Sequence, residues 1–141
     1  MLPTKILIPV DGSENCKRAN DFALELSKKI GASMVFLHVI DIPISSYRYR
    51  LAKENLFSGL DEAGWSLLGD FEAKAKSKGI PCDIILTHGD PATQILAIAK
   101  KRNCDCVVMG KRGLGRIRRI LLGSVSDRVT RLAEVPVITV K

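Results

Sequence analysis

The stretch SMVFLHVI (Ser33–Ile40) is almost continuously apolar and lies between Gly31 and Asp41. An apolar run of this length with such boundaries is typical of a strand that is buried on both faces. Strands of this kind occur in parallel sheets whose two faces are covered by helices. The stretch therefore predicts an interior strand of an α/β protein.

The same pattern recurs outward in both directions along the chain. Further short apolar runs predict strands at Lys5–Val10, Cys82–Thr87, Cys106–Met109 and Val135–Val140. The segments between the strands carry apolar residues at helical spacing. These residues are Ala19, Phe22, Ala23, Leu26 and Ile30, then Trp65, Leu68, Phe71 and Ala75, then Ala92, Ile95, Leu96 and Ala99, and finally Val125, Val129, Leu132 and Ala133.

Turn and cap residues separate the predicted elements. Ser13, after Asp11-Gly12, and Asp90, before Pro91, are expected helix N-caps, and Gly31 ends the first helix. Because parallel strands need long crossover connections, the β-α alternation predicts a three-layer α/β/α sandwich with a five-stranded parallel sheet. The length of 141 residues indicates a single domain, 1–141.

Composition excludes several classes of protein. No window approaches the roughly 18 uninterrupted apolar residues of a membrane span, and Met1–Val10 lacks the features of a secretory signal. The four cysteines do not form a disulfide framework, and Cys104-Asp105-Cys106 lacks the second pair that a zinc site needs. We therefore expect a cytoplasmic protein with reduced thiols and no membrane association.

The net charge of +7 is concentrated in one segment. Between Gly110 and Arg131 there are seven basic residues and one acidic residue, so this segment carries almost all of the excess. A concentrated basic stretch indicates an anionic partner, which is either a nucleotide phosphate or a larger polyanion. A solvated surface with no partner is the alternative.

The basic segment contains two glycine-rich stretches, GKRGLG (110–115) and GSVS (123–126). The first follows a predicted strand, and ligands of open parallel sheets bind beyond the carboxyl ends of the strands. The second opens a helix, whose first N–H groups favour an anion. No P-loop is present, and Arg118 occupies the place of the third glycine of a dinucleotide fingerprint. Phosphate binding, tight turns and helix capping all remain open from position alone.

The spacing of Gly110, Gly113 and Gly123-Ser124 resembles the ATP-binding motif of the universal stress protein family. Four other fragments resemble this family in the same order. They are KILIPVDGS (5–13), FLHVID (36–41), GDP (89–91) and VPVITV (135–140). Lys111, where the family often has a small or polar residue, and the basic run 115–119 depart from the pattern.

The resemblance implies a Rossmann-like adenine-nucleotide-binding fold, ATP held with Mg²⁺ or Mn²⁺ through its phosphates, and a homodimer formed through residues 135–140. It also implies the binding residues. These are Pro9, Val10 and Asp11 on the nucleoside side, Val39 at the adenine, Met109, Gly110, Arg112 and Gly113 beside ribose and phosphates, and Gly123, Ser124, Val125 and Ser126 at the phosphate chain.

Three functions follow from these features. The first is a nucleotide-dependent regulatory module of the stress response, without catalytic residues, that acts on an unidentified protein partner. The second is a slow ATPase that uses Asp11 and the basic insert. The third is a polyanion or nucleic-acid binder through residues 111–131, which the sequence favours less. The direction of Arg116, Arg118 and Arg119 stays open.

Four other features have a structural and a functional interpretation. His38 is expected to be a hydrogen-bonded core residue, and His88 is expected to make loop hydrogen bonds. Cys16 stands in the first turn of a helix, where the thiol pKa is often lowered. The run YRYR (47–50) suits either RNA contact or a cover over a nucleotide.

Overall fold

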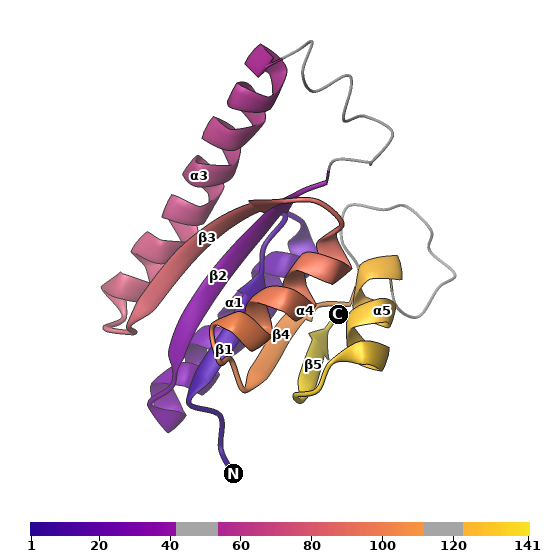
Figure 1. The fold of residues 1–141 in the computed structure, drawn as a ribbon. Helices are drawn as coiled ribbons and strands as arrows, with labels where there is room; N and C mark the ends of the chain where they lie inside the picture. The colour runs from indigo at the N-terminus through magenta and orange to yellow at the C-terminus, as the bar shows by residue number, and fades with distance from the viewer. Residues whose placement is uncertain (42–53, 112–122) are drawn as a thin grey trace.

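The structure is a computed structural model that describes residues 1–41, 54–111 and 123–141. Strands and helices alternate along these residues (Figure 1). They are β1 (Lys5–Pro9), α1 (Glu14–Ile30), β2 (Ser33–Ile40), α3 (Glu54–Ser77), β3 (Cys82–His88), α4 (Pro91–Lys101), β4 (Cys106–Gly110), α5 (Ser124–Leu132) and β5 (Val137–Val140).

The five strands form one parallel sheet in the order β3-β2-β1-β4-β5. The chain builds the sheet outward from β1 through β2 to β3, and then crosses back to place β4 on the other side of β1. The strand order therefore reverses between β1 and β4. The predicted α/β class with a five-stranded parallel sheet is confirmed.

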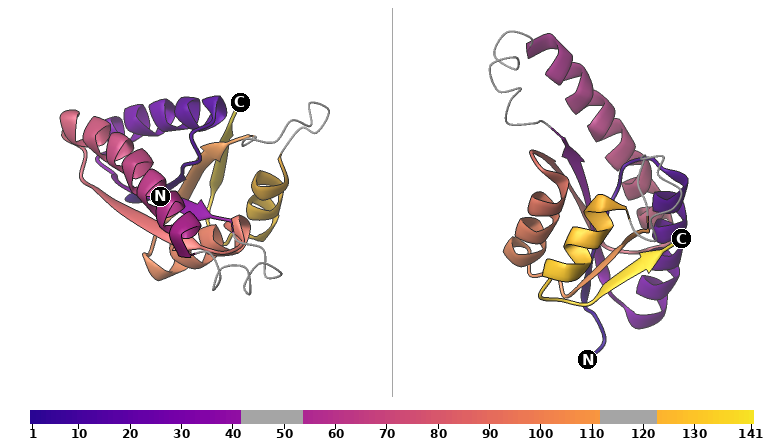
Figure 2. Two further views of the ribbon diagram at one scale, coloured as in Figure 1. Left: turned by 90° about the horizontal axis from the view of Figure 1, so that it is seen from above. Right: turned by 90° about the vertical axis from the view of Figure 1, so that its right-hand side faces the viewer.

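Helices cover both faces of the sheet (Figure 2). One face packs against α1 and α3, with Ile8, Phe36 and Leu68 in its core. The other packs against α4 and α5, with Leu7, Leu37 and Val107 in its core. Among the described helices, no stretch has the length and apolar character that a membrane crossing requires.

The predicted helix caps are present. Ser13 accepts a hydrogen bond from the N–H of Cys16 at the start of α1, and Gly31 ends that helix in the left-handed conformation with φ 74°. Asp90 caps α4 by accepting from the N–H of Thr93. These caps satisfy backbone groups that a helix end otherwise leaves unpaired, so they fix where α1 and α4 begin.

Three apolar side chains that were expected on buried faces are exposed. Phe22 is 42% exposed, Trp65 46% and Leu132 57%. On α3 the buried residue is Gly64, the neighbour of Trp65. A Cβ at Gly64 would lie 2.8 Å from Leu86 Cδ1 and 2.9 Å from His38 Cδ2. The close contact at Gly64 turns Trp65 toward solvent.

Phe22 and Leu132 lie outside the buried faces of their helices. The buried residues of α1 are Cys16, Ala19, Asn20, Ala23, Leu24 and Ser27, and those of α5 are Ser126 and Val129. Leu132 instead lines an open groove of about 310 Å³ between α4 and the α5–β5 connection. β5 also begins two residues later than predicted, at Val137, after Pro136, which has no N–H for a ladder.

Asp105 fastens the beginning of the chain to the sheet. Its carboxylate accepts hydrogen bonds from the N–H and hydroxyl of Thr4, at 2.9 and 2.8 Å, and from the N–H of Lys5 at 3.0 Å. Burial opposes ionisation of this carboxyl, but the hydrogen bonds prevail and hold the pKa of Asp105 below its ordinary value. The ionised carboxylate therefore stabilises the fold.

We expect Asp105→Asn to lower the free energy of unfolding at pH 7 by about 1–3 kcal/mol, the usual cost of a lost charged hydrogen-bond partner. Because the folded pKa lies below the unfolded one, the wild-type advantage is complete above the ordinary carboxyl pKa. It disappears as pH falls through the folded value. Urea unfolding at pH 7 and at acidic pH measures both effects.

The matched control for this substitution is Asp83→Asn. Asp83 forms an ion pair with Arg102 at 2.9 Å, and its side chain is 65% exposed. An exposed pair of this kind contributes about 0–1 kcal/mol. Equal losses of stability in the two variants at pH 7 would contradict the role given to Asp105.

Candidate functional site

The candidate site lies at the carboxyl ends of β1 and β4, where the strand order reverses. In an open parallel sheet this point is the usual ligand position, because the loops leaving the two strands turn toward opposite faces. The segment 11–13 follows β1, Lys111 follows β4, and the start of α5 is joined to Lys111 by a hydrogen bond. These three segments form the candidate site.

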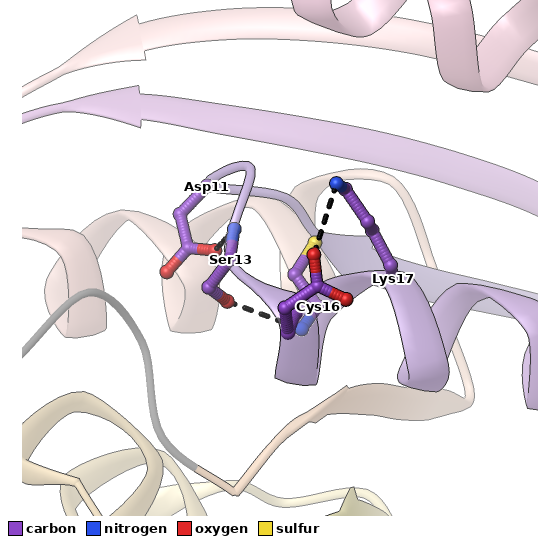
Figure 3. A network of polar contacts seen from close by, with 5 residues as sticks. Asp11, Ser13, Cys16 and Lys17 are labelled. Carbon is purple, nitrogen blue, oxygen red and sulfur yellow. Dashed lines mark hydrogen bonds and ion pairs between the residues drawn. The ribbon is translucent and has the colours of Figure 1, made fainter.

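The loop after β1 is held by its own side chains (Figure 3). Asp11 Oδ1 accepts a hydrogen bond from the N–H of Ser13 at 2.9 Å, and Gly12 between them has φ 79°. The Ser13 hydroxyl in turn accepts from the N–H of Cys16 at 3.1 Å. A left-handed residue flanked by two side-chain caps makes a tight turn, so the carboxylate of Asp11 stays at the end of β1.

Gly110 allows α1 to approach the end of β4 closely. A Cβ at this position would lie 2.9 Å from the backbone carbon of Asn15 and 3.1 Å from its carbonyl oxygen. Backbone atoms in the first turn of α1 cannot withdraw as a flexible side chain would. The contact thus requires glycine at 110 and brings the β1 and β4 loops together.

The start of α5 is tied to the end of β4 by two hydrogen bonds. Ser126, which is buried, donates its hydroxyl proton to the carbonyl of Gly110 at 2.8 Å. The N–H of Gly123 donates to the carbonyl of Lys111 at 2.8 Å, and the N–H of Lys111 donates to the carbonyl of Val140 at 2.7 Å. Ser126 was expected to offer its proton to phosphate, and it offers it to the loop instead.

Among the residues that the structure describes, no side chain caps the start of α5. Gly123 is the N-cap residue of α5 and supplies no side-chain hydrogen bond to the first turn. Ser124, the first helical residue, is exposed. The first N–H groups of a helix without such a cap, with the helix dipole behind them, attract an anion.

Most of the predicted binding residues lie on these elements. Val39 near the end of β2 and Met109 near the end of β4 both belong to the core on the α4/α5 face. The others among the described residues are Pro9, Val10 and Asp11 at the end of β1, Gly110 at the end of β4, and Gly123, Ser124, Val125 and Ser126 at the start of α5. Arg112 and Gly113 lie outside the described residues.

Part of the basic segment is paired with acidic residues. Arg128 contacts Asp90 at 2.8 Å and Arg131 contacts Asp127 at 2.9 Å. Hydrogen bonds from Thr93, followed by Arg128, lower the pKa of Asp90. These two arginines therefore offer less free charge to a polyanion than the sequence predicts. Arg116, Arg118 and Arg119 lie outside the described residues.

The idea that Cys16 is an activated thiol is wrong. Burial raises its pKa to about 11, and this effect outweighs the backbone hydrogen bonds that favour the thiolate. The residue is 3% exposed, and its Sγ lies 3.8 Å from the carbonyl oxygen of Pro9. All four cysteines have free thiols, as predicted.

Both histidines are hydrogen-bonded. His38 is half-buried, and its Nδ1 lies 2.7 Å from the Val10 carbonyl oxygen, which confirms the expected hydrogen bond. His88 Nε2 lies 2.6 Å from Asp61 Oδ1, so its partner is on α3 and not in a loop. The run 47–50 lies outside the described residues.

Two residues of the site gave no signal in the sequence. Asn15 acts through its backbone against Gly110, and Lys111 acts through its N–H and carbonyl groups. Contacts made by the main chain place little demand on residue type. The glycine at 110 is the only trace that such a contact leaves in the sequence.

Comparison with known proteins agrees with this geometry. The sequence model of the Universal stress protein family matches residues 3–141. Universal stress protein MJ0531 of Methanocaldococcus jannaschii is 33% identical over 138 residues, which cover 97% of this chain and 81% of that protein.

Two solved structures extend the comparison. Protein MJ0577 of the same organism superposes with a TM-score of 0.91 at 27% identity and covers 100% of this chain and 97% of its own. A universal stress family protein of Arabidopsis thaliana, solved with AMP bound, has a TM-score of 0.70 at 29% identity and covers 99% and 92% of the two chains.

The Gly110 contact predicts the effect of one methyl group. Gly110→Ala places a Cβ against the Asn15 backbone, so we expect a loss of about 1–3 kcal/mol in the free energy of unfolding, the usual cost of overpacking. Gly69→Ala on α3 is the control, because a Cβ there meets nothing within 4 Å.

The free energy of unfolding of the Gly69→Ala control should rise. Replacing a mid-helix glycine with alanine stabilises a helix by about 0.5–1 kcal/mol. Chemical unfolding of both variants measures the two changes. A Gly110→Ala protein as stable as the wild type would show that α1 does not approach β4 this closely.

Proposed function

Since this chain belongs to the universal stress protein family, we propose that it binds ATP, with a divalent cation, at the carboxyl edge of its sheet between β1 and β4. The protein then acts as a nucleotide-dependent regulatory module whose bound state is read by a protein partner. The observation that carries the proposal is the convergence of the start of α5, whose N-cap residue Gly123 has no side chain, with the loops after β1 and β4 at the switch point.

We propose that each part of the nucleotide meets a different group of residues. Val39, on the α4/α5 face, is proposed to contact the adenine, and Met109 on the same face to lie beside the ribose and phosphates. The first N–H groups of α5 and the exposed hydroxyl of Ser124 face the phosphates. AMP in the Arabidopsis relative supports an adenine nucleotide as the ligand class.

The cation is proposed to be held mainly by the phosphate oxygens. In the described part of the chain, no group of three or more histidine, cysteine, aspartate or glutamate residues is arranged to hold a metal. Mg²⁺ commonly binds through phosphates with one or two carboxylates. The half-buried carboxylate of Asp11 is the acidic group that the β1 loop supplies. Mg²⁺ or Mn²⁺ would neutralise phosphate charge there.

We further propose a homodimer formed through β5. Val107 donates to the carbonyl of Pro136 and Lys111 to that of Val140, so the even-numbered residues of this strand pair with β4. By alternation, the backbone groups of Val137 and Thr139 face the open edge. An edge strand of half-buried residues is a template for pairing with a second chain.

A cytoplasmic location is also part of the proposal. All four cysteines are free thiols, and three of them are buried. Reducing compartments keep thiols in this state, whereas secreted proteins usually oxidise them.

Ser124→Asp tests nucleotide binding. The added carboxylate stands in the first turn of α5, where it repels phosphate but suits the helix dipole by about 0.3–1 kcal/mol. We expect ATP affinity, measured by calorimetry with Mg²⁺, to fall at least about tenfold, or 1.4 kcal/mol. Thermal stability should stay level or rise.

Ser66→Asp provides the charge-matched control, since Ser66 is exposed on α3 away from the start of α5. Its affinity for ATP should equal that of the wild type. Wild-type protein that binds no ATP, or a Ser124→Asp variant that binds it normally, would overturn the proposed function.

Thr139→Pro tests the dimer. Proline removes an N–H that faces the open edge, while the hydrogen bonds between β4 and β5 are made by the alternate residues. We expect the wild type to sediment as a dimer and the variant as a folded monomer with unchanged far-UV circular dichroism. A monomeric wild type contradicts the dimer, and so does a variant that stays dimeric.

A further inference from the structure

The polar side chain of His38 interrupts an otherwise apolar strand. The residues before and after it on β2 are Leu37 and Val39, and burial of an imidazole among such residues is costly unless a hydrogen bond compensates. The compensating partner is the carbonyl of Val10, 2.7 Å from Nδ1. Because a carbonyl oxygen only accepts, Nδ1 carries the proton in this contact.

This hydrogen bond fixes the first residue beyond β1. Val10 is 3% exposed, and its N–H donates to the carbonyl of Leu37 at 2.8 Å. Two successive residues of β2 therefore hold both backbone polar groups of Val10. The peptide plane between Val10 and Asp11 has no freedom to rotate without the loss of one of these bonds.

The imidazole ring is itself held in place from the other side. At Gly64 of α3, an added Cβ would lie 2.9 Å from His38 Cδ2 and 3.6 Å from Nε2. The α3 backbone thus covers the ring closely. His38 lies between a rigid helix and the Val10 carbonyl, and its rotamer is set by packing.

The faces of the sheet give this contact a direction. Met34 and Phe36, four and two residues before His38 on β2, belong to the α1/α3 core, whereas Leu37 and Val39 belong to the α4/α5 core. His38 therefore draws the Val10 carbonyl toward β2 and the α1/α3 face. In a trans peptide the N–H points opposite to the C=O, so the Asp11 N–H is turned toward β4 and the α4/α5 face.

We infer that His38 is a positioning residue for the candidate site. It does not touch the ligand. By drawing the Val10 carbonyl away, it keeps a partial negative charge out of the region proposed for phosphate and ribose, and it presents the Asp11 N–H there instead. The inference rests on the proposed function for its ligand, while the geometry of the loop is tested separately.

The first experiment compares three substitutions at His38 by calorimetry with ATP and Mg²⁺. His38→Asn keeps an N–H donor near the place of Nδ1, and His38→Leu removes it at similar size. His38→Gln puts its amide one bond farther out. We expect affinity near that of the wild type for Asn, and at least about tenfold weaker binding for Leu and Gln.

His88 supplies the matched control. It is a second half-buried histidine at the carboxyl edge of the sheet, but its partner is Asp61 on α3. His88→Leu should leave ATP affinity within about twofold of the wild type. If His38→Leu does not fold, the comparison of Asn with Gln still decides, because both variants are polar and differ in where the amide lies.

Amide hydrogen exchange at residues 11–13 measures how firmly the loop is held in the absence of nucleotide. We expect faster exchange in His38→Leu and His38→Gln than in the wild type, His38→Asn or His88→Leu. Equal exchange and equal affinity across the folded His38 variants would overturn the inference. If the wild type binds no ATP, the proposed function fails, and the exchange data alone decide whether His38 positions the loop.

Discussion

The close approach between the first turn of α1 and the end of β4 is the constraint on which the site depends. Gly110 leaves room for the Asn15 backbone, and the strand order places β4 beside β1. With a larger residue at 110, α1 would have to move away from β4, and the loop after β1 would move with it. The meeting of three loop segments at one point follows from this contact.

Hydrogen bonds then fix the conformation of the loop after β1 and the position of the start of α5. Asp11 and Ser13 hold the turn into α1, and Ser126 holds the start of α5 against Gly110. Each of these side chains makes a hydrogen bond to a backbone group. A preformed surface of backbone N–H groups suits the recognition of phosphate.

Much of the fold was predictable because local and global signals agree. The apolar run at Ser33–Ile40 and the caps at Ser13 and Asp90 specify the β-α alternation directly. The buried helix faces were less predictable. Helical spacing placed Phe22 and Trp65 inside, but small residues such as Gly64 let the helices pack closely on other faces.

Part of the candidate site was likewise predictable from the sequence and part was not. Chain order and strand ends bring Asp11, Gly110 and Gly123 to one edge, as the sequence suggests. The alternative of an activated Cys16 thiol fails because burial outweighs the effect of the helix start on its pKa. The backbone roles of Asn15 and Lys111 leave no pattern of residue types to recognise.

Lys111 connects strand β5 to the start of helix α5 through its two backbone polar groups. Its N–H is bonded to the last residue of β5 and its carbonyl to the first residue of the α5 start. The outer strand β5 and the start of α5 are thus hydrogen-bonded to the same residue, one through its N–H and the other through its carbonyl. A displacement of β5 along its axis that preserves these bonds must carry the beginning of α5 with it.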